Sequence, residues 1–423
     1  MPLTLAQKIL SAHRVTPKDE EDVQAGRIVN CRVDIVLAND ITAPLAIKSF
    51  RDMGAGRVFD RKRVILVMDH FTPQKDIASA EQVLVSRAFA EEQGLTHYYE
   101  AGEAGVEHAL LPELGLVGPG ELVVGADSHT CTYGGLGAFA TGMGSTDIAA
   151  AMALGENWFK VPESIRVNFD GVLPPHVGGK DLILWIIGRL GVDGARYKAL
   201  EFGGPVIDTL PVEERLTMAN MAIEAGGKAG LFSADEATLH FCRDAGRRGD
   251  RTLHPDPGAQ YEQSLSADVS SFEPLAACPH SPENVRPVSE LKDIPLNQVF
   301  IGSCTNGRLS DLRAAARVLK GRKVKRGLRC LVLPATPNVW RAALREGLLE
   351  VFSEAGCIVG PPSCGPCLGG HLGILAAGEK AAATSNRNFK GRMGSLEAEV
   401  YLVNPAVAAA SAVAGIIIHP DGI

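Results

Sequence analysis

A recurring unit of strand, reactive turn and helix constrains the fold of this chain more than any other feature. β-Branched apolar runs are each followed by a turn containing Gly, Asp, Ser or Cys and then by an Ala-rich helical pattern. The clearest runs are RVILVMDHFT (63–72), ELVVGADSHT (121–130) and NQVFIGSCTN (297–306). In a later unit Asn404 is the expected helix N-cap and Pro405 the first helical residue. Strands alternating with helices indicate an α/β fold with parallel sheets.

Reactive side chains follow the ends of these predicted strands. In open parallel sheets, ligands bind in the crevice beyond the carboxyl ends of the strands. We therefore expect one crevice to collect Asp69, His70, Asp127, Ser128, His129, Cys304, Cys364 and Arg387.

The chain has 423 residues, too many for a single domain with one hydrophobic core. The pattern of predicted strands and helices changes twice along it. Residues 164–250 begin with the alternating run SIRVNFDG and continue as long helical stretches. Residues 250–290 are rich in Pro, Ser and charge and have no clear period. We therefore expect α/β domains at residues 1–163, 164–285 and 286–423.

Composition and charge argue against several classes of protein. With 46% hydrophobic and 22% charged residues, the chain is typical of soluble globular proteins. The net charge of -7 argues against a broad surface for nucleic acid, and the basic cluster at 321–329 is short. The longest apolar run, Ala406 to Ile418, is too short to span a bilayer, and the N-terminus does not have the pattern of a signal peptide. We expect a cytoplasmic protein with no membrane role.

Three of the nine cysteines carry the strongest chemical signal. They are Cys304 in VFIGSCTNGR and the pair Cys364 and Cys367 in GPPSCGPCLGG. Three thiolates are one fewer than a four-iron, four-sulfur cluster normally takes, so one iron would lack a protein ligand. Such an iron is a Lewis acid that can bind a substrate hydroxyl.

The residues alone leave other interpretations of these cysteines open. Cys-Gly-Pro-Cys also matches the dithiol of thioredoxin-like oxidoreductases, although Pro361 and Pro362 precede it where a strand is needed. His371 is available as a fourth ligand for a structural zinc ion. Small buried cysteines are the third alternative, and it suits Cys31, Cys242 and Cys330 better than a loop rich in Gly and Pro.

Five sequence blocks carry a family resemblance that covers nearly the whole chain. They are MDH at 68–70, GADSHT with the following GGLGAFATGMGSTD, GSCTNGR, PPSCGPCLGG and TSNRNFKGRMG. In type and order they resemble the signature blocks of the aconitase superfamily. The resemblance implies three α/β domains around one [4Fe–4S] cluster per subunit, with Cys304, Cys364 and Cys367 as its ligands. It also implies that the swivelling fourth domain of full-length aconitases is lacking.

The resemblance assigns roles to side chains that the residues alone leave ambiguous. A lone histidine is more often structural than catalytic, and arginine is exposed by default. The resemblance implies that His70, oriented by Asp69, protonates the departing hydroxyl, and that Arg387 and Arg392 bind substrate carboxylates. The further catalytic residues that it implies are His108, Asp127, His129 and Glu224. The further substrate-binding residues are Ser128, Asn220 and Asn386.

The function implied by the resemblance is a hydro-lyase of leucine biosynthesis. It isomerises 2-isopropylmalate and 3-isopropylmalate by dehydration and rehydration. Pro44 stands where aconitases carry a substrate-contacting glutamine, which disfavours citrate. A homoaconitase of lysine biosynthesis and a dimethylmalate-type hydro-lyase stay open as alternatives. From other classes, a thiol oxidoreductase and an RNA-binding regulator also remain.

The resemblance also implies a partner protein that carries the catalytic base. In the family, the catalytic base is a serine of the swivelling domain, and we find no segment of the sequence left over for that domain. We therefore expect a small subunit to supply the base in trans, in a heteromer that acts on a small hydroxy di- or tricarboxylate.

Overall fold

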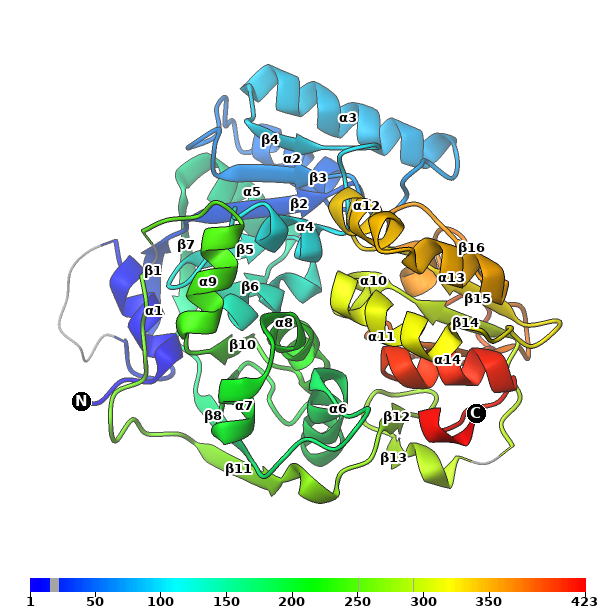
Figure 1. The fold of residues 1–423 in the computed structure, drawn as a ribbon. Helices are drawn as coiled ribbons and strands as arrows, with labels where there is room; N and C mark the ends of the chain where they lie inside the picture. Colours follow the sequence, from blue (N-terminus) through cyan, green and yellow to red (C-terminus); the bar gives the residue numbers. More distant parts are fainter. Residues whose placement is uncertain (16–22, 250, 292) are drawn as a thin grey trace.

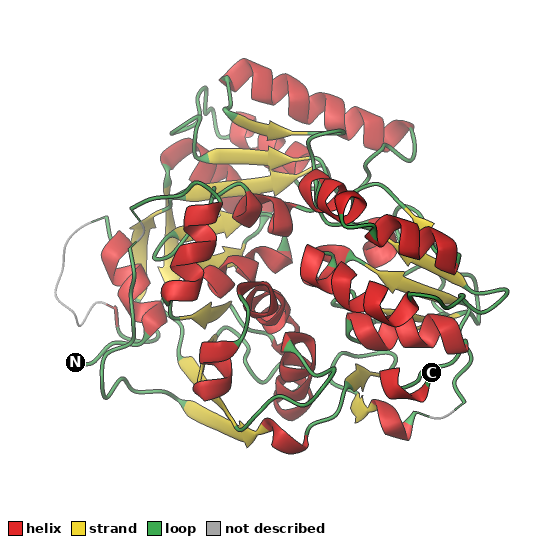
Figure 2. Ribbon diagram, in the orientation of Figure 1, coloured by secondary structure: helices red, strands yellow, loops and turns green. Residues whose placement is uncertain are grey.

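The computed structural model describes residues 1–15, 23–249, 251–291 and 293–423. Across these residues, the strands form three larger sheets and one two-stranded antiparallel pair. The larger sheets surround the middle of the molecule, and helices cover their faces (Figure 1, Figure 2). The predicted α/β fold is confirmed.

The first sheet is parallel throughout and has the strand order β4-β3-β2-β5-β6. Its strands are β2 (Ile35–Asn39), β3 (Val64–Val67), β4 (His97–Tyr99), β5 (Leu122–Gly125) and β6 (Phe139–Gly142). Its helical elements are α2 (Ala43–Asp52), α3 (Ile77–Gln93), α4 (Glu107–Glu113), the 3₁₀ helix η2 (Ser128–Leu136) and α5 (Ser145–Leu154).

Both faces of this sheet are buried, because successive strand side chains point to opposite sides. Val36 and Ala38 pack into the core with α2, α3 and α5, whereas Ile35 and Leu37 pack with α4 and η2. The near-continuous apolar runs of the sequence follow from this double burial. The N-terminal helix α1 (Leu5–His13) and the pair β1 (Ile28–Arg32) and β7 (Glu156–Lys160) lie beside this sheet (Figure 1).

The second sheet is also parallel and has the order β10-β9-β8-β11. Its strands are β8 (Ser164–Asp170), β9 (Ala199–Gly203), β10 (Ala229–Phe232) and β11 (Gln263–Asp268). Its helical elements are α6 (Gly179–Leu190), α7 (Pro205–Thr209), α8 (Val212–Asn220), the 3₁₀ helix η3 (Met221–Ala225) and α9 (Glu236–Asp244).

The third sheet has the order β13-β12-β18-β17-β14-β15-β16 and is parallel from β18 to β16. Its strands are β12 (Leu275–Ala277), β13 (Val285–Pro287), β14 (Gln298–Ile301), β15 (Arg329–Val332), β16 (Ile358–Val359), β17 (Lys380–Ala383) and β18 (Glu399–Leu402). Its helical elements are α10 (Ser303–Asn306), α11 (Leu309–Leu319), α12 (Pro337–Arg345), α13 (Leu348–Ala355), the 3₁₀ helix η6 (Gly365–Leu368) and α14 (Pro405–Ala414).

The sheets follow one another along the chain, as the predicted domains do. The second sheet starts with Ser164, directly after the end of β7 at Lys160. β12 already pairs with β18 of the third sheet, although it begins at Leu275. The domain boundaries near 164 and 285 stay predictions. Among the described residues, no helix combines the length and the apolar character needed to cross a membrane.

Close backbone contacts join the first sheet to the second. A Cβ atom at Gly134 of η2 would lie 1.8 Å from the carbonyl oxygen of Gly230 in β10. Farther from this contact, the carboxylate of Glu201 in β9 accepts hydrogen bonds from the amides of Leu5 and Ala6 at 3.2 and 3.0 Å. The position of η2, which carries His129, therefore depends on a glycine.

We predict that Gly134→Ala lowers the free energy of unfolding by about 1–3 kcal/mol or more, because the added methyl group must push two buried backbones apart. Gly56→Ala is the matched control, since nothing lies within 4 Å of a Cβ atom there. Thermal unfolding of the two variants checks this. Equal midpoints for both variants would contradict the packing argument.

Candidate active site

The three predicted cluster cysteines lie together at the edge of the third sheet. Cys304 is in α10, directly after β14, whereas Cys364 is the N-cap residue of η6 and Cys367 lies within η6. All three are buried and free. Asn386, which follows β17, donates from Nδ2 to the Cys304 sulfur at 3.2 Å, and its Oδ1 accepts from the Cys367 sulfur at 3.7 Å. One asparagine thus connects cysteines from two segments.

The backbone of both cysteine segments is unusual where it approaches the site. Ser303, next to Cys304, has φ of 79°, in the region that side chains rarely adopt. Gly365 has φ of 57°, and a Cβ atom there would lie 2.6 Å from Cδ2 of Leu333. The sequence from Cys364 to Cys367 can turn this tightly because glycine tolerates positive φ.

A cavity of about 250 Å³ lies against these cysteines. Most of the predicted site residues line it, and they come from the first and third sheets. The predicted residues in its lining are Asp69, His70, His108, Asp127, His129, Cys304, Cys364, Cys367, Asn386, Arg387 and Arg392. The further lining residues are Asn39, Ile41, Thr42, Val106, Glu107 and Leu368.

Three predicted residues are outside the lining. Asn220 and Glu224 lie behind it: Asn220 Oδ1 accepts from Asn386 Nδ2 at 3.2 Å, and Glu224 accepts from Arg387. Ser128 is exposed at the first position of η2, and its role in substrate binding stays a prediction.

The donor atoms of the site fit a cluster held by three sulfurs. Burial raises the pKa of Cys304 to about 12 and that of Cys364 well above its ordinary value, so thiolates here require a compensating cation. Among the described cysteines, no fourth one lines the cavity. His371, the alternative zinc ligand, is directed elsewhere: its Nε2 lies 3.1 Å from the carbonyl oxygen of Pro73.

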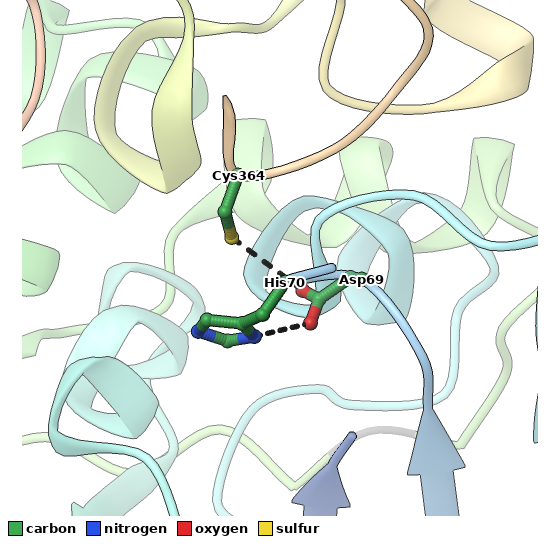
Figure 3. Close-up of side chains that lie close together, drawn as sticks. All are labelled: Asp69, His70 and Cys364. Carbon is green, nitrogen blue, oxygen red and sulfur yellow. Dashed lines mark hydrogen bonds and ion pairs between the residues drawn. The ribbon is translucent and has the colours of Figure 1, made fainter. Parts of the chain in front are cut away.

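Two aspartates hold His70, and Figure 3 shows the one that contacts its ring, Asp69. Its Nδ1 lies 2.6 Å from Oδ1 of Asp69, and its backbone amide donates to Oδ1 of Asp40 at 3.0 Å. Burial opposes the charged imidazolium, but the nearby Cys364 sulfur and the carboxylates of Asp69 and Asp40 outweigh it and raise the pKa of His70 well above its ordinary value. The predicted pairing of Asp69 with His70 is therefore present in the structure.

A second network is centred on Asp127, which follows β5. Its Oδ1 lies 3.0 Å from Nε2 of His108 and accepts from the backbone amide of His129 at 2.7 Å. Burial raises the pKa of Asp127, but hydrogen bonds from His108 and His129 outweigh it, so the pKa lies well below its ordinary value. Burial lowers the pKa of His108. Asp127 is thus a partly buried carboxylate between two histidines.

This network continues into the other two sheets. Nε2 of His129 lies 2.9 Å from Oε1 of Glu224 in η3. Nε of Arg387, which follows β17, donates to both oxygens of Glu224 at 2.8 and 3.0 Å. Glu224 thereby orients a histidine from the first sheet and an arginine from the third.

Two acidic residues of the site were missed from the sequence. Asp40 follows β2 and holds the loop of His70, as described above. Glu107 accepts from Asn39 Nδ2 at 3.0 Å, and its other carboxyl oxygen is buried with no hydrogen-bond partner among the described residues. Burial, together with the charges of Asp69 and Asp127, raises the pKa of Glu107 well above its ordinary value. The position of Asn39-Asp40 at a strand end was the signal available for Asp40.

Arg392 also has unused hydrogen-bonding capacity. Its Nη2 lies 3.9 Å from the Cys367 sulfur, and within the described part of the chain its buried Nε has no hydrogen-bond partner. With Arg387 it gives the cavity two guanidinium groups, which bind carboxylates bidentately. The site therefore combines three cysteine sulfurs, histidines paired with carboxylates and two guanidinium groups.

The sequence matches the Aconitase family (aconitate hydratase) over residues 7–415. The chain belongs to the aconitase family. Among aconitase-family relatives, it is similar to "3-isopropylmalate dehydratase large subunit" of Nitratidesulfovibrio vulgaris (strain DSM 19637 / Miyazaki F), with 70% identity over 423 residues and 100% of both chains covered. A relative with the same name in Moorella thermoacetica is 60% identical over 421 residues, which cover 100% of this chain and 99% of the relative.

The fold of the aconitase family is also seen in a solved structure. The crystal structure of Thermococcus kodakaraensis aconitase X (holo-form) matches with a TM-score of 0.50 and 15% identity, covering 94% of this chain and 98% of that one. The arrangement of sheets described above is thus an aconitase-type fold.

We predict that Asp69→Asn lowers the pKa of His70, because it removes a charge that stabilises the imidazolium. With its pKa raised in the folded chain, protonated His70 stabilises the fold below its ordinary pKa of about 6.5, and this contribution is lost as the pH rises through the folded pKa. NMR titration of ¹³C-labelled histidines measures the pKa of His70 in the folded and in the unfolded chain. The contribution of His70 to stability follows from the difference between these two pKa values. Asp76→Asn, at an exposed helix N-cap, is the control, and an unchanged His70 titration in Asp69→Asn would contradict the assignment.

Proposed function

We propose that this chain is the large, catalytic subunit of a 3-isopropylmalate dehydratase, which interconverts 2-isopropylmalate and 3-isopropylmalate in leucine biosynthesis. The observation that carries the proposal is the single cavity lined by three cysteines, three carboxylate-oriented histidines and two arginines. The names of the full-length relatives support the choice of substrate.

Cys304, Cys364 and Cys367 would hold one [4Fe–4S] cluster. When bound, the cluster supplies a Lewis-acidic iron to the substrate hydroxyl and to a carboxylate oxygen. The burial of the three sulfurs and the Asn386 amide that contacts two of them suit this role.

His70 is the proposed general acid of the dehydration. Asp69 holds its Nδ1, so Nε2 is the atom that delivers a proton to the departing hydroxyl. The raised pKa of His70 keeps that proton on the ring near neutral pH. In the rehydration step the same nitrogen accepts a proton from the incoming water.

Arg387 and Arg392 are the proposed carboxylate-binding residues. Charge accumulates on a substrate carboxylate when the adjacent carbon loses its proton, and fixed guanidinium groups stabilise that charge. Glu224 orients Arg387, and Asn220 orients Asn386 beside it. The partly buried carboxylate of Asp127 contacts His108 and His129, and the three residues are proposed to take part in proton transfer within the cavity. Ser128 is proposed as a further substrate contact.

Apolar side chains give the cavity a surface for the isopropyl group. Ile41, Val106 and Leu368 line it, and Pro44, in the first turn of α2, stands where a glutamine amide would favour citrate. Burying an apolar substituent against such a surface is favourable, whereas a third carboxylate there would need a partner. This argument supports isopropylmalate over homoaconitate.

A thiol oxidoreductase requires an exposed thiolate with a lowered pKa. Cys364 and Cys367 are both buried, and the pKa of Cys364 is raised. These properties count against that alternative. The net charge of -7 counts against an RNA-binding regulator.

Anaerobic reconstitution with iron, sulfide and the small subunit tests the proposal. We expect isopropylmalate to be the preferred substrate over homoaconitate and citrate. The Cys304→Ala variant should not retain the cluster. Its kcat should fall at least about 1,000-fold, because the Lewis acid is lost. Cys278→Ala is the control, since Cys278 is outside the cavity. A zinc-only site, or full turnover by Cys304→Ala, would refute the proposal.

We also expect the chain to be inactive without the small subunit, which would supply the catalytic base. The assay compares the reconstituted large subunit alone with the mixture of both subunits. Substrate turnover by the large subunit alone at the rate of the mixture would show that the base is within this chain.

A further inference from the structure

A lysine is buried behind the cysteine segments. Lys180 lies in the first turn of α6 and is 1% exposed. Burying an ammonium group is costly unless its hydrogen bonds and charge are compensated, so lysine is rarely buried without a structural or functional reason.

The Lys180 ammonium donates to two segments of the third sheet. It reaches the carbonyl oxygens of Thr384 and Ser385 at 2.9 and 2.6 Å, and Oδ1 of Asn306 at 3.4 Å. The two carbonyls directly precede Asn386 and Arg387, and Asn306 is in α10 with Cys304. A side chain from the second sheet thus joins the segments that carry a cluster ligand and a proposed substrate ligand.

Other hydrogen bonds make this junction rigid. Oγ1 of Thr305 donates to the same Thr384 carbonyl at 2.5 Å, and Nδ2 of Asn306 donates to Asp311 at 2.9 Å. Three acceptors therefore meet at the ammonium, and the residues that carry them, Asn306, Thr384 and Ser385, are all buried.

The charge of Lys180 also matters to the cysteines. Burial lowers the pKa of Lys180 to about 8, while the negative charges of Asp311 and of the Cys304 and Cys367 sulfurs act in the opposite direction. An [4Fe–4S] core bound by three thiolates is an anion, and a buried cation nearby stabilises it because interior charges are weakly screened.

We infer that Lys180 is a positioning residue of the active site, which fixes the backbone before Asn386 and Arg387 and places a positive charge behind the cysteine sulfurs. This inference rests on the proposed function. Lys180 touches neither substrate nor reacting atoms in this assignment. It acts through the loops that it holds and through its charge.

A second cavity makes this inference testable. It has a volume of about 460 Å³, is lined by Lys180, Asn306 and Asp311, and shares no lining residue with the active-site cavity. A small amine can therefore occupy the space of a shortened side chain without entering the active site.

The experiment uses Lys180→Met, which removes the charge, and Lys180→Ala, with and without ethylamine. Both variants are purified with ethylamine present, so that folding is supported, and then dialysed. We expect the reconstituted clusters to be lost to a chelator about 10- to 100-fold faster than in wild type, the usual effect of removing an outer-shell partner. Ethylamine should restore cluster retention in Lys180→Ala, whereas ethanol should not.

Lys228→Met is the matched control. Lys228 is partly buried, and its ammonium donates to the carbonyl oxygen of Gly142 at 3.2 Å. Iron and sulfide content, the visible absorption of the cluster and the melting temperature of the cluster-free chain are measured for every variant. Lys228→Met should retain its cluster like wild type.

The outcomes separate this inference from the proposed function. If wild type binds no cluster, the proposed function fails. If wild type binds it and both Lys180 variants retain it equally well, or if ethanol rescues as well as ethylamine, the role of Lys180 is overturned. A lower melting temperature with unchanged cluster retention would show a purely structural role and would also overturn it.

Discussion

A chain of hydrogen-bonded polar side chains from Asp127 through His129 and Glu224 to Arg387 joins all three sheets at the active site. Its links are short: His129 Nε2 lies 2.9 Å from Glu224, and Arg387 donates to Glu224 at 2.8 Å. Charges in a protein interior are tolerated only when they are paired, and leaving one unpaired costs several kcal/mol. Each sheet therefore supplies a group that the others need, and the relative position of the sheets is tied to the chemistry of the site.

Close packing of the backbone supports this arrangement. Gly134 lets η2 approach β10 of the second sheet. A second glycine, Gly105, lies so near the third sheet that a Cβ atom there would be 2.6 Å from the carbonyl oxygen of Ala335. Contacts of this kind fix distances between elements more firmly than side-chain packing does, because backbone atoms cannot change rotamer. The proposed proton donor and carboxylate-binding groups are thereby held in place before a ligand arrives, which is a condition for efficient catalysis.

Local signals in the sequence predicted the fold class well. The Asn404 side chain accepts from the Val407 amide at 2.9 Å, as its position before Pro405 indicates, and the strand ends bring Asp69 and Cys304 to one cavity. Groups that act through distant partners could not be found this way. Lys180 reaches a carbonyl 204 positions away, and neither periodicity nor spacing encodes such a contact. The roles of the lining residues came from the family resemblance, because a histidine or an arginine in isolation is ambiguous.

Glu107 and Arg392 both line the cavity, and an oxygen of Glu107 and Nε of Arg392 are buried with no hydrogen-bond partner in the residues that the structure describes. A ligand that forms these hydrogen bonds offsets the desolvation cost of each group, about 1–3 kcal/mol. A hydrocarbon of the same shape forms no hydrogen bond and leaves this cost uncompensated. Selectivity at this cavity thus includes rejection: ligands without the matching hydrogen-bonding groups bind less well, even when their shape fits the cavity.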